Sequence, residues 1–348
     1  MFPRIFENGG NGLRGRVAGI SILLVGFNVL AWVWAFVAFR NYPLLMGTAL
    51  LAYSFGLRHA VDADHIAAID NVTRKLMQEG KRPVAVGLYF SLGHSTIVFI
   101  LSVVLAATTS ALQERFGNFK AIGALVGTSV SAFFLFAIAA ANIYIWTATW
   151  RTFQTVKGGG RVVEEDLFAM MAGGGLLSRL FRGLFRLIEQ SWHMYALGLL
   201  FGLGFETATE VGLLGISATE AANGLSPWAT LIFPVLFSAG MALIDTADGV
   251  LMLGAYGWAF VKPIRKLYYN LTITFVSVLI AVLVGGLETL GLLAGQLKLG
   301  GPFWEFIGVV NENFGLLGYG IIGVFAFVWL ASLVVYRLKR YDEIEMLT

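Results

Sequence analysis

Apolar residues gather into eight long stretches along this chain, separated by short segments rich in glycine and charged residues. A helix needs about 20 apolar residues to cross a bilayer. Each stretch reaches that length, so each is predicted to be a transmembrane helix. The eight predicted spans are residues 17–39, 44–70, 84–107, 120–146, 193–216, 228–256, 268–294 and 316–338.

Composition predicts an all-α polytopic membrane protein and argues against a soluble domain. Of the 348 residues, 57% are hydrophobic and 13% are charged, and the mean hydropathy is +0.77. Soluble domains are typically about 45–50% apolar and about 25% charged. The chain has no cysteine, which removes thiolate ligands and disulfides. No nucleotide-binding G-x-x-x-x-G-K-[ST] loop is present, and we expect membrane lipids, not nucleic acid, around the chain.

The basic residues predict how the chain crosses the membrane. With the N-terminus inside, 19 of the 24 lysines and arginines fall in inner segments, four fall in outer loops, and Arg58 lies within a span. Cytoplasmic loops are enriched in lysine and arginine, so about eight helices with both termini cytoplasmic are predicted. The first span is too long for a signal peptide and is expected to remain as a helix. We expect a multi-pass protein of the bacterial cytoplasmic membrane.

One long connection, residues 147–192, divides the predicted helices into two four-helix halves, residues 1–146 and 193–348. Within this connection Arg179, Arg182 and Arg186 recur at helical spacing among leucine and phenylalanine. This pattern is typical of an amphipathic helix on the inner leaflet. Residues 90–96 also weakly resemble residues 201–207. Transporters are often built from repeats, with the binding site where the repeats meet.

Polar residues are densest in the second predicted span, where five charged or ionisable side chains lie within eight residues. A charged group inside a bilayer is costly and usually marks an ion or proton path. At about 100° per residue, His59, Asp62 and His65 share an arc of about 120° and can converge on one ion. Asp64 points away from this arc, so either the helix is broken here or Asp64 serves a neighbouring helix. Histidine and carboxylate together bind divalent transition metals.

Three other spans carry ionisable side chains at spacings that suit the same chemistry. His94 lies among hydroxyl residues in the third span, and an imidazole there is a good ligand for nickel, cobalt, copper or zinc. Glu206 and Glu210 are four residues apart in the fifth span and share a helical face. Two such carboxylates repel each other unless a cation or proton lies between them. Asp245 and Asp248 are three residues apart in the sixth span.

Each of these side chains has a plainer reading as a buried, hydrogen-bonded group that only holds helices together. For Glu206 and Glu210 the plainer reading is snorkelling to the membrane surface. Interfacial placement is also expected for Glu288, near the outer end of the seventh span, and an aromatic belt is expected for His193 beside Trp192.

Four of these segments resemble, in order, the signature motifs of the nickel/cobalt transporter family. They are residues 58–66, 90–98, 203–210 and 240–249, although the family usually has aspartate where Glu206 stands. The resemblance implies a secondary permease of eight helices that imports Ni²⁺ or Co²⁺ with high affinity. It also implies that His59, Asp62, Asp64 and His65 are essential for transport, with His94 close by.

We therefore hypothesise a permease, not an enzyme, that carries Ni²⁺, with Co²⁺ as a second candidate cargo, and needs no other cofactor. The candidate metal residues are His59, Asp62, Asp64, His65, His94, Glu206, Asp245 and Asp248. In this hypothesis the imidazoles select the metal, and the carboxylates compensate its charge. Two alternatives stay open. One is a proton-coupled carrier of another substrate, and the other is an intramembrane metal-dependent hydrolase, although no H-E-x-x-H motif is present.

Overall fold

Helices make up all the regular structure in the part of the chain that the computed structural model describes, which is residues 10–107, 110–157, 188–204, 208–259 and 263–338. The helical class therefore agrees with the prediction. The elements are α2 (Gly10–Phe39), α3 (Pro43–His59), α4 (Ala63–Gln78), α5 (Val86–Ala107), α6 (Ser110–Lys157), η1 (Ser191–His193), α9 (Met194–Phe201), α10 (Ala208–Ala222), α11 (Pro227–Thr230), α12 (Ile232–Ala259), α13 (Pro263–Leu297), α14 (Pro302–Glu312) and α15 (Phe314–Leu338).

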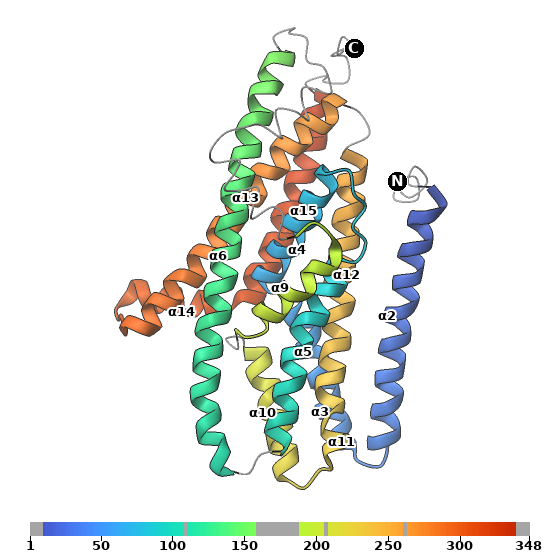
Figure 1. Ribbon diagram of the computed structural model, residues 1–348, viewed down its shortest axis with the longest axis vertical. Coiled ribbons are helices and arrows are strands. Elements are labelled where there is room, and N and C mark those ends of the chain that lie inside the picture. Colours follow the sequence, from blue (N-terminus) through green and yellow to red (C-terminus); the bar gives the residue numbers. More distant parts are fainter. Residues whose placement is uncertain (1–9, 108–109, 158–187, 205–207, 260–262, 339–348) are drawn as a thin grey trace.

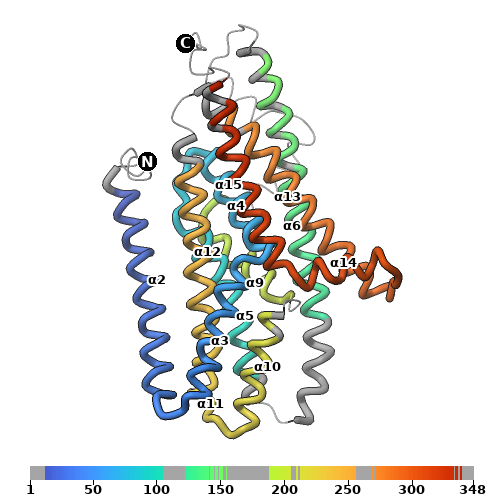
Figure 2. Tube along the Cα trace, turned by 180° about the vertical axis from the view of Figure 1, so that it is seen from behind, coloured from blue at the N-terminus to red at the C-terminus, as the bar shows by residue number. Residues whose placement is uncertain are grey.

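The long helices form an elongated bundle in which most run close to the long axis (Figure 1). Helix α2 stands at one edge and packs against α12 and α3, while α6 and α13 pack along each other on another side. Helix α14 projects sideways from the bundle in both views (Figures 1 and 2). Among the shorter helices, α3 packs against α12 and α10, and both α9 and α10 pack against α5.

In the part of the chain that the structure describes, six helices are long and apolar enough to cross a membrane, and the pair α3 and α4 makes a seventh candidate, bent by 51° at its break. These seven coincide with seven of the eight predicted spans, and the chain is a multi-pass membrane protein. The predicted span 193–216 is not one helix, because the described residues there form η1, α9 and then α10. Two of the predicted spans are thus not single helices in the described residues.

Three predicted segments differ from the structure. The predicted connection 147–192 begins inside α6, which continues to Lys157, and the predicted amphipathic helix around Arg182 lies outside the described residues apart from its end at Ile188. The predicted outer loop after the seventh span contains α14, which is too short to be recognised as a span. Helix α4 also extends eight residues beyond the predicted end of the second span.

Helix α4 is the centre of the bundle, since every residue except Asp64 is buried. It packs against α12, α13 and α15. Some of its buried polar side chains bond to a neighbouring helix instead of water. The Arg74 guanidinium donates to Thr274 Oγ1 and to Asn71 Oδ1, both at 2.9 Å, and Ser277 Oγ donates to Asp70 Oδ2 at 2.7 Å. The bonds to Thr274 and from Ser277 fix α4 against α13.

Helix α15 crosses the break between α3 and α4 at a glycine. A Cβ atom added at Gly318 would collide with the carbonyl oxygen of Val61 in that break. Close approach of two backbones in a membrane bundle commonly needs such a small residue. Gly318 therefore allows α15 to cover the interrupted helix directly.

We expect Gly318→Ala to destabilise the protein, because α15 must move away from Val61 to make room for the methyl group. Overpacking of this kind costs about 1–3 kcal/mol. The thermal unfolding midpoint of the purified protein in detergent should fall by several degrees. Gly320→Ala is the matched control, since a Cβ there meets no atom within 4 Å. Equal midpoints for the two variants would contradict the close contact.

Candidate metal centre

The break between α3 and α4 brings two histidines together. Helix α3 ends at His59 and α4 begins at Ala63, so only residues 60–62 separate the two helices. Asp62 has an extended backbone (φ −63°, ψ 146°), and its carbonyl accepts the first bond of α4 from Ile66 N at 3.2 Å. Six residues of unbroken helix would separate His59 and His65 by about 9 Å along the axis. Instead their ring centroids are 4.7 Å apart.

A third imidazole, His94 of α5, completes a compact cluster. Its ring centroid lies 4.8 Å from that of His59 and 4.9 Å from that of His65. The Nε2 atoms of His59 and His94 are 3.0 Å apart. One nitrogen from each of the three rings lies within 4.8 Å of the others, and all three residues are buried. Among the histidines and acidic residues that the structure describes, these three histidines form the group whose ligand atoms lie close enough to hold a metal ion.

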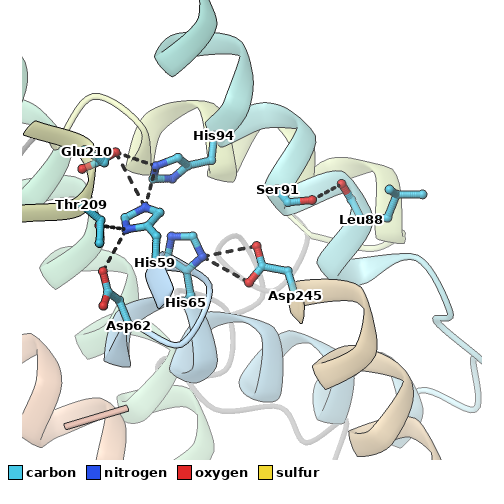
Figure 3. Close-up of polar contacts among 9 residues, drawn as sticks. All are labelled: His59, Asp62, His65, Leu88, Ser91, His94, Thr209, Glu210 and Asp245. Atoms are coloured by element: carbon cyan, nitrogen blue, oxygen red, sulfur yellow. Dashed lines mark hydrogen bonds and ion pairs between the residues drawn. The ribbon is translucent and has the colours of Figure 1, made fainter. Parts of the chain in front are cut away.

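Glu210, in the first turn of α10, adds a carboxylate to the cluster. Its Oε1 lies 2.8 Å from His94 Nε2 and 3.7 Å from His59 Nε2, and the side chain is only 1% exposed. Figure 3 shows its carboxylate pointing toward both rings. Tetrahedral ligands bound about 2.1 Å from a metal lie about 3.4 Å from one another. The separations in this cluster bracket that value, so small side-chain movements would let three imidazoles and one carboxylate bind one ion.

Carboxylates hold the other nitrogens of two of these rings (Figure 3). Asp62 Oδ2 lies 2.9 Å from His59 Nδ1, and Thr209 Oγ1 lies 3.3 Å from the same nitrogen. Asp245 of α12 places its two oxygens 3.2 and 3.3 Å from His65 Nδ1. When Nδ1–H donates to a carboxylate, the Nε2 lone pair is left to bind a metal. His65 Nε2 is buried and has no hydrogen-bond partner.

The structure therefore divides the residues that the sequence grouped together. His59, His65 and His94 converge, whereas Asp62 and Asp245 contact the Nδ1 atoms of His59 and His65. The sequence left two alternatives for Asp64, a broken helix at the motif or service to a neighbouring helix, and the structure contains the broken helix. This break explains how His65 reaches His59 although the two would lie on different turns of a continuous helix.

The remaining predicted metal residues lie outside this cluster or outside the described residues. Asp64 Oδ1 and Asp248 Oδ2 are buried without hydrogen-bond partners. Neither belongs to the group whose ligand atoms converge. Glu206 lies outside the described residues. Asp248 follows Asp245 by three residues on α12, so it lies about one turn farther along that helix.

Glu210 was not among the residues predicted to bind metal, although its spacing from Glu206 had indicated a shared helical face. Thr209 was also missed, because hydroxyl residues are common in these spans. Glu288 is buried and accepts a hydrogen bond from Ser131 Oγ at 2.8 Å, and its expected interfacial position stays a prediction. His193 packs against the exposed Trp192, with ring centroids 4.1 Å apart, and its place in an aromatic belt stays a prediction.

Chemically, the cluster suits a borderline divalent transition metal. Imidazole nitrogens bind nickel, cobalt, copper and zinc well, whereas Mg²⁺ and Ca²⁺ prefer shells made entirely of oxygen. A buried cation also needs negative charge nearby. The Glu210 carboxylate faces the rings directly, and those of Asp62 and Asp245 stand behind His59 and His65.

Known proteins resemble this chain over nearly its whole length. The profile of the NicO family, described as high-affinity nickel-transport protein, matches residues 45–335. A "High-affinity nickel transport protein" of Cupriavidus necator is 58% identical over 333 residues, covering 96% of this chain and 95% of the relative. A "Hydrogenase nickel incorporation protein HupN" of Bradyrhizobium diazoefficiens is 52% identical, covering 92% and 84%. A "Cobalt transport protein NhlF" of Rhodococcus rhodochrous is 39% identical, covering 94% of each. No solved structure matches the chain.

Proposed function

We propose that this chain, which belongs to the NicO family of high-affinity nickel-transport proteins, is a permease that carries Ni²⁺ into the cell. Its relatives are named for nickel or, in one case, cobalt, so Co²⁺ is the second cargo that we propose. The observation that carries the proposal is the buried group of three imidazoles at the break of α3 and α4. Such a donor set binds these two metals and rejects the more abundant Mg²⁺ and Ca²⁺.

We assign different roles to the polar residues of the centre. His59, His65, His94 and Glu210 would hold the ion, because their donor atoms face one another. Asp62 and Asp245 would orient the rings of His59 and His65 through Nδ1, as carboxylates commonly do behind metal-bound histidines. Asp64, Asp248 and Glu206 would add negative charge around a dication.

The position of the centre in the chain supports an alternating-access mechanism. The three histidines belong to the first half, residues 1–146, whereas Glu210 and Asp245 belong to the second, residues 193–348. A site made by both halves can change its opening when the halves move against each other, and interrupted helices commonly form such sites. In this proposal both interrupted regions supply the centre: α3 and α4 give histidines, and the start of α10 gives Glu210.

The driving force that we propose is the membrane potential of a bacterial cytoplasmic membrane, with both termini of the chain in the cytoplasm. A potential of 100 mV, negative inside, contributes about 2.3 kcal/mol for each elementary charge that moves inward. A dication therefore gains about 4.6 kcal/mol on full crossing, enough to concentrate it more than 1,000-fold. No nucleotide hydrolysis is needed for this accumulation.

Competition among metals tests the proposed cargo. In cells that express the chain, uptake of radioactive nickel should be inhibited clearly by an excess of Co²⁺ and only weakly by the same excess of Mn²⁺ or Mg²⁺. The reason is that sites with imidazole ligands follow the order Mn²⁺ below Co²⁺ below Ni²⁺ in affinity. Cells with the empty vector provide the background. A carrier of an organic substrate or a hydrolase would leave cellular nickel at that background.

Asp245→Asn should weaken nickel binding without removing the site. Loss of a carboxylate behind a metal-bound histidine typically costs about 10- to 100-fold in affinity or activity. Calorimetry on the purified protein should therefore show the native number of nickel ions, bound with a higher Kd. If the number of bound ions fell instead, Asp245 would itself be a ligand and the proposed division of roles would be wrong.

A further inference from the structure

A small cavity lies beside the metal centre, where the end of α3, the start of α10 and the junction of α14 with α15 meet. Its lining includes Arg58, Asp62, Thr209, Asn311 and Glu312. Its volume is only about 10 Å³, which is room for about one water molecule. The cavity is therefore polar and, in this conformation, narrow.

Two residues of this cavity wall also contact the metal centre. Asp62 Oδ2 lies 2.9 Å and Thr209 Oγ1 lies 3.3 Å from His59 Nδ1. The cavity is thus separated from the cluster of imidazoles by a single layer of side chains. An ion in the cavity would need to pass only Asp62 and the His59 ring to reach the proposed ligands.

Charged side chains lead from the surface into the cavity. Glu312, in the last turn of α14, is exposed, whereas Asp62 is buried, so one carboxylate stands at the mouth and one at the inner end. The exposed Arg58 also belongs to the lining. Two carboxylates attract a dication, and one guanidinium reduces that attraction. A site on a transport path must bind weakly enough to release its ion again.

One wall of the cavity is the junction between α14 and α15. The helix breaks at Asn313 (φ −113°, ψ 32°), and α15 begins at the next residue. Gly315 then lies against the cavity, since a Cβ added there would stand 3.2 Å from Asp62 Oδ1 and 3.4 Å from Arg58 Nε. Helix α14 itself projects from the bundle and rests mainly on α13 (Figure 2). Moving α14 away from α13 would widen the cavity and would break the hydrogen bond that Asn311 Nδ2 donates to Leu287 O at 3.1 Å.

We propose that this cavity is the docking site at which a hydrated divalent cation enters the protein, and that Glu312 is the first side chain to attract it. The proposal rests on the proposed function. Helices α3 and α10 occupy the half of the bundle opposite the first turn of α2 and the last turn of α15 (Figure 1). With both termini cytoplasmic, as proposed, this half faces the outside of the cell. A hydrated ion is larger than the present cavity, so docking moves the α14–α15 junction outward.

The natural absence of cysteine makes this proposal directly testable. Glu312→Cys is expressed in cells and treated from outside with membrane-impermeant methanethiosulfonates of similar size, one carrying a trimethylammonium and one a sulfonate. The positive adduct repels the cation, so we expect radioactive nickel uptake at low nickel to fall at least about 10-fold. The negative adduct replaces the lost carboxylate and should raise uptake above that of the untreated variant. Added Ni²⁺ should slow both reactions.

Glu305→Cys is the matched control, because Glu305 is exposed on the same face of α14, two turns away from the cavity. Its uptake should not depend on the sign of the adduct. The proposal is overturned if both adducts at position 312 leave uptake unchanged, or if both block it equally, as simple obstruction would. Glu312→Gln, with a KM for nickel raised several-fold and unchanged maximal uptake, supplies a second test if the cysteine variant does not insert. Absence of nickel uptake by the unmodified chain would instead refute the proposed function.

Discussion

Replacing His59 by alanine is expected to abolish nickel uptake. Its Nε2 lies 3.0 Å from that of His94 and 3.7 Å from Glu210 Oε1, so it is the central donor of the proposed set. Without this ring, the ion keeps two imidazoles and one carboxylate, and Asp62 loses the partner of its Oδ2. A buried carboxylate without that partner is itself unfavourable. Accumulation of radioactive nickel in cells should therefore fall to the level of cells without the protein.

The control for this prediction is the histidine outside the cluster. His193→Ala removes a ring that packs on Trp192 and accepts a hydrogen bond from Glu189 N at 3.1 Å. Nickel uptake by this variant should stay close to native. Both variants must be present in the membrane in equal amounts, as measured by immunoblot of isolated membranes. Native uptake by a correctly inserted His59→Ala protein would disprove the site.

Glu210→Gln should reduce uptake at low nickel by about 100-fold or more. The substitution keeps the size of the side chain and removes its charge. Glu210 is the carboxylate that faces His94 and His59 at 2.8 and 3.7 Å, so its charge acts directly on an ion held there. Two unit charges 4 Å apart interact by about 4 kcal/mol at an effective dielectric constant of about 20, which corresponds to about 10³ in a binding constant.

Glu220→Gln on the same helix is the comparison for this effect. Glu220 lies near the far end of α10, ten residues from the centre, and is partly exposed. The same loss of charge at this distance should change nickel uptake by less than about 2-fold, because exposed charges farther apart than about 8–10 Å are largely screened. If the two variants lose uptake equally, the charge of Glu210 has no special role at the centre.

The sequence was sufficient to predict the helical class and most of the spans, because long apolar stretches in a membrane protein have few alternatives. Six of the predicted spans are single helices, and the second is the bent pair of α3 and α4. The histidines that converge were also predicted. An imidazole within an apolar span is rare enough to indicate function without any structure.

The sequence could not show which carboxylates face the ion. A helical wheel placed Asp62 on the same arc as His59 and His65, and that geometry holds only for an unbroken helix. The break at residues 60–62 turns α4 by 51° and leaves Asp62 beside the Nδ1 atom of His59. Asp245 contacts His65 across 180 positions of sequence. No local pattern encodes such a contact.

Glu210 shows the same limit from the other direction. Its spacing from Glu206 indicated a shared face, but only the packing of α10 against α5 and α3 shows that this face meets His94 and His59. Helix α14 was missed because an 11-residue helix cannot span a bilayer and carries too weak a pattern to be recognised. The cavity beside Asp62 depends on that helix, so the proposed entrance was also beyond prediction from sequence.

X-ray absorption at the nickel edge of the purified, nickel-loaded protein tests the central claim most directly. Imidazole rings bound to nickel give a characteristic multiple-scattering pattern, and carboxylates or water do not. We expect a spectrum that requires about three imidazoles per nickel, in agreement with His59, His65 and His94, and two in the His94→Ala protein. A shell made only of oxygen, or one unchanged by His94→Ala, would contradict the proposed centre.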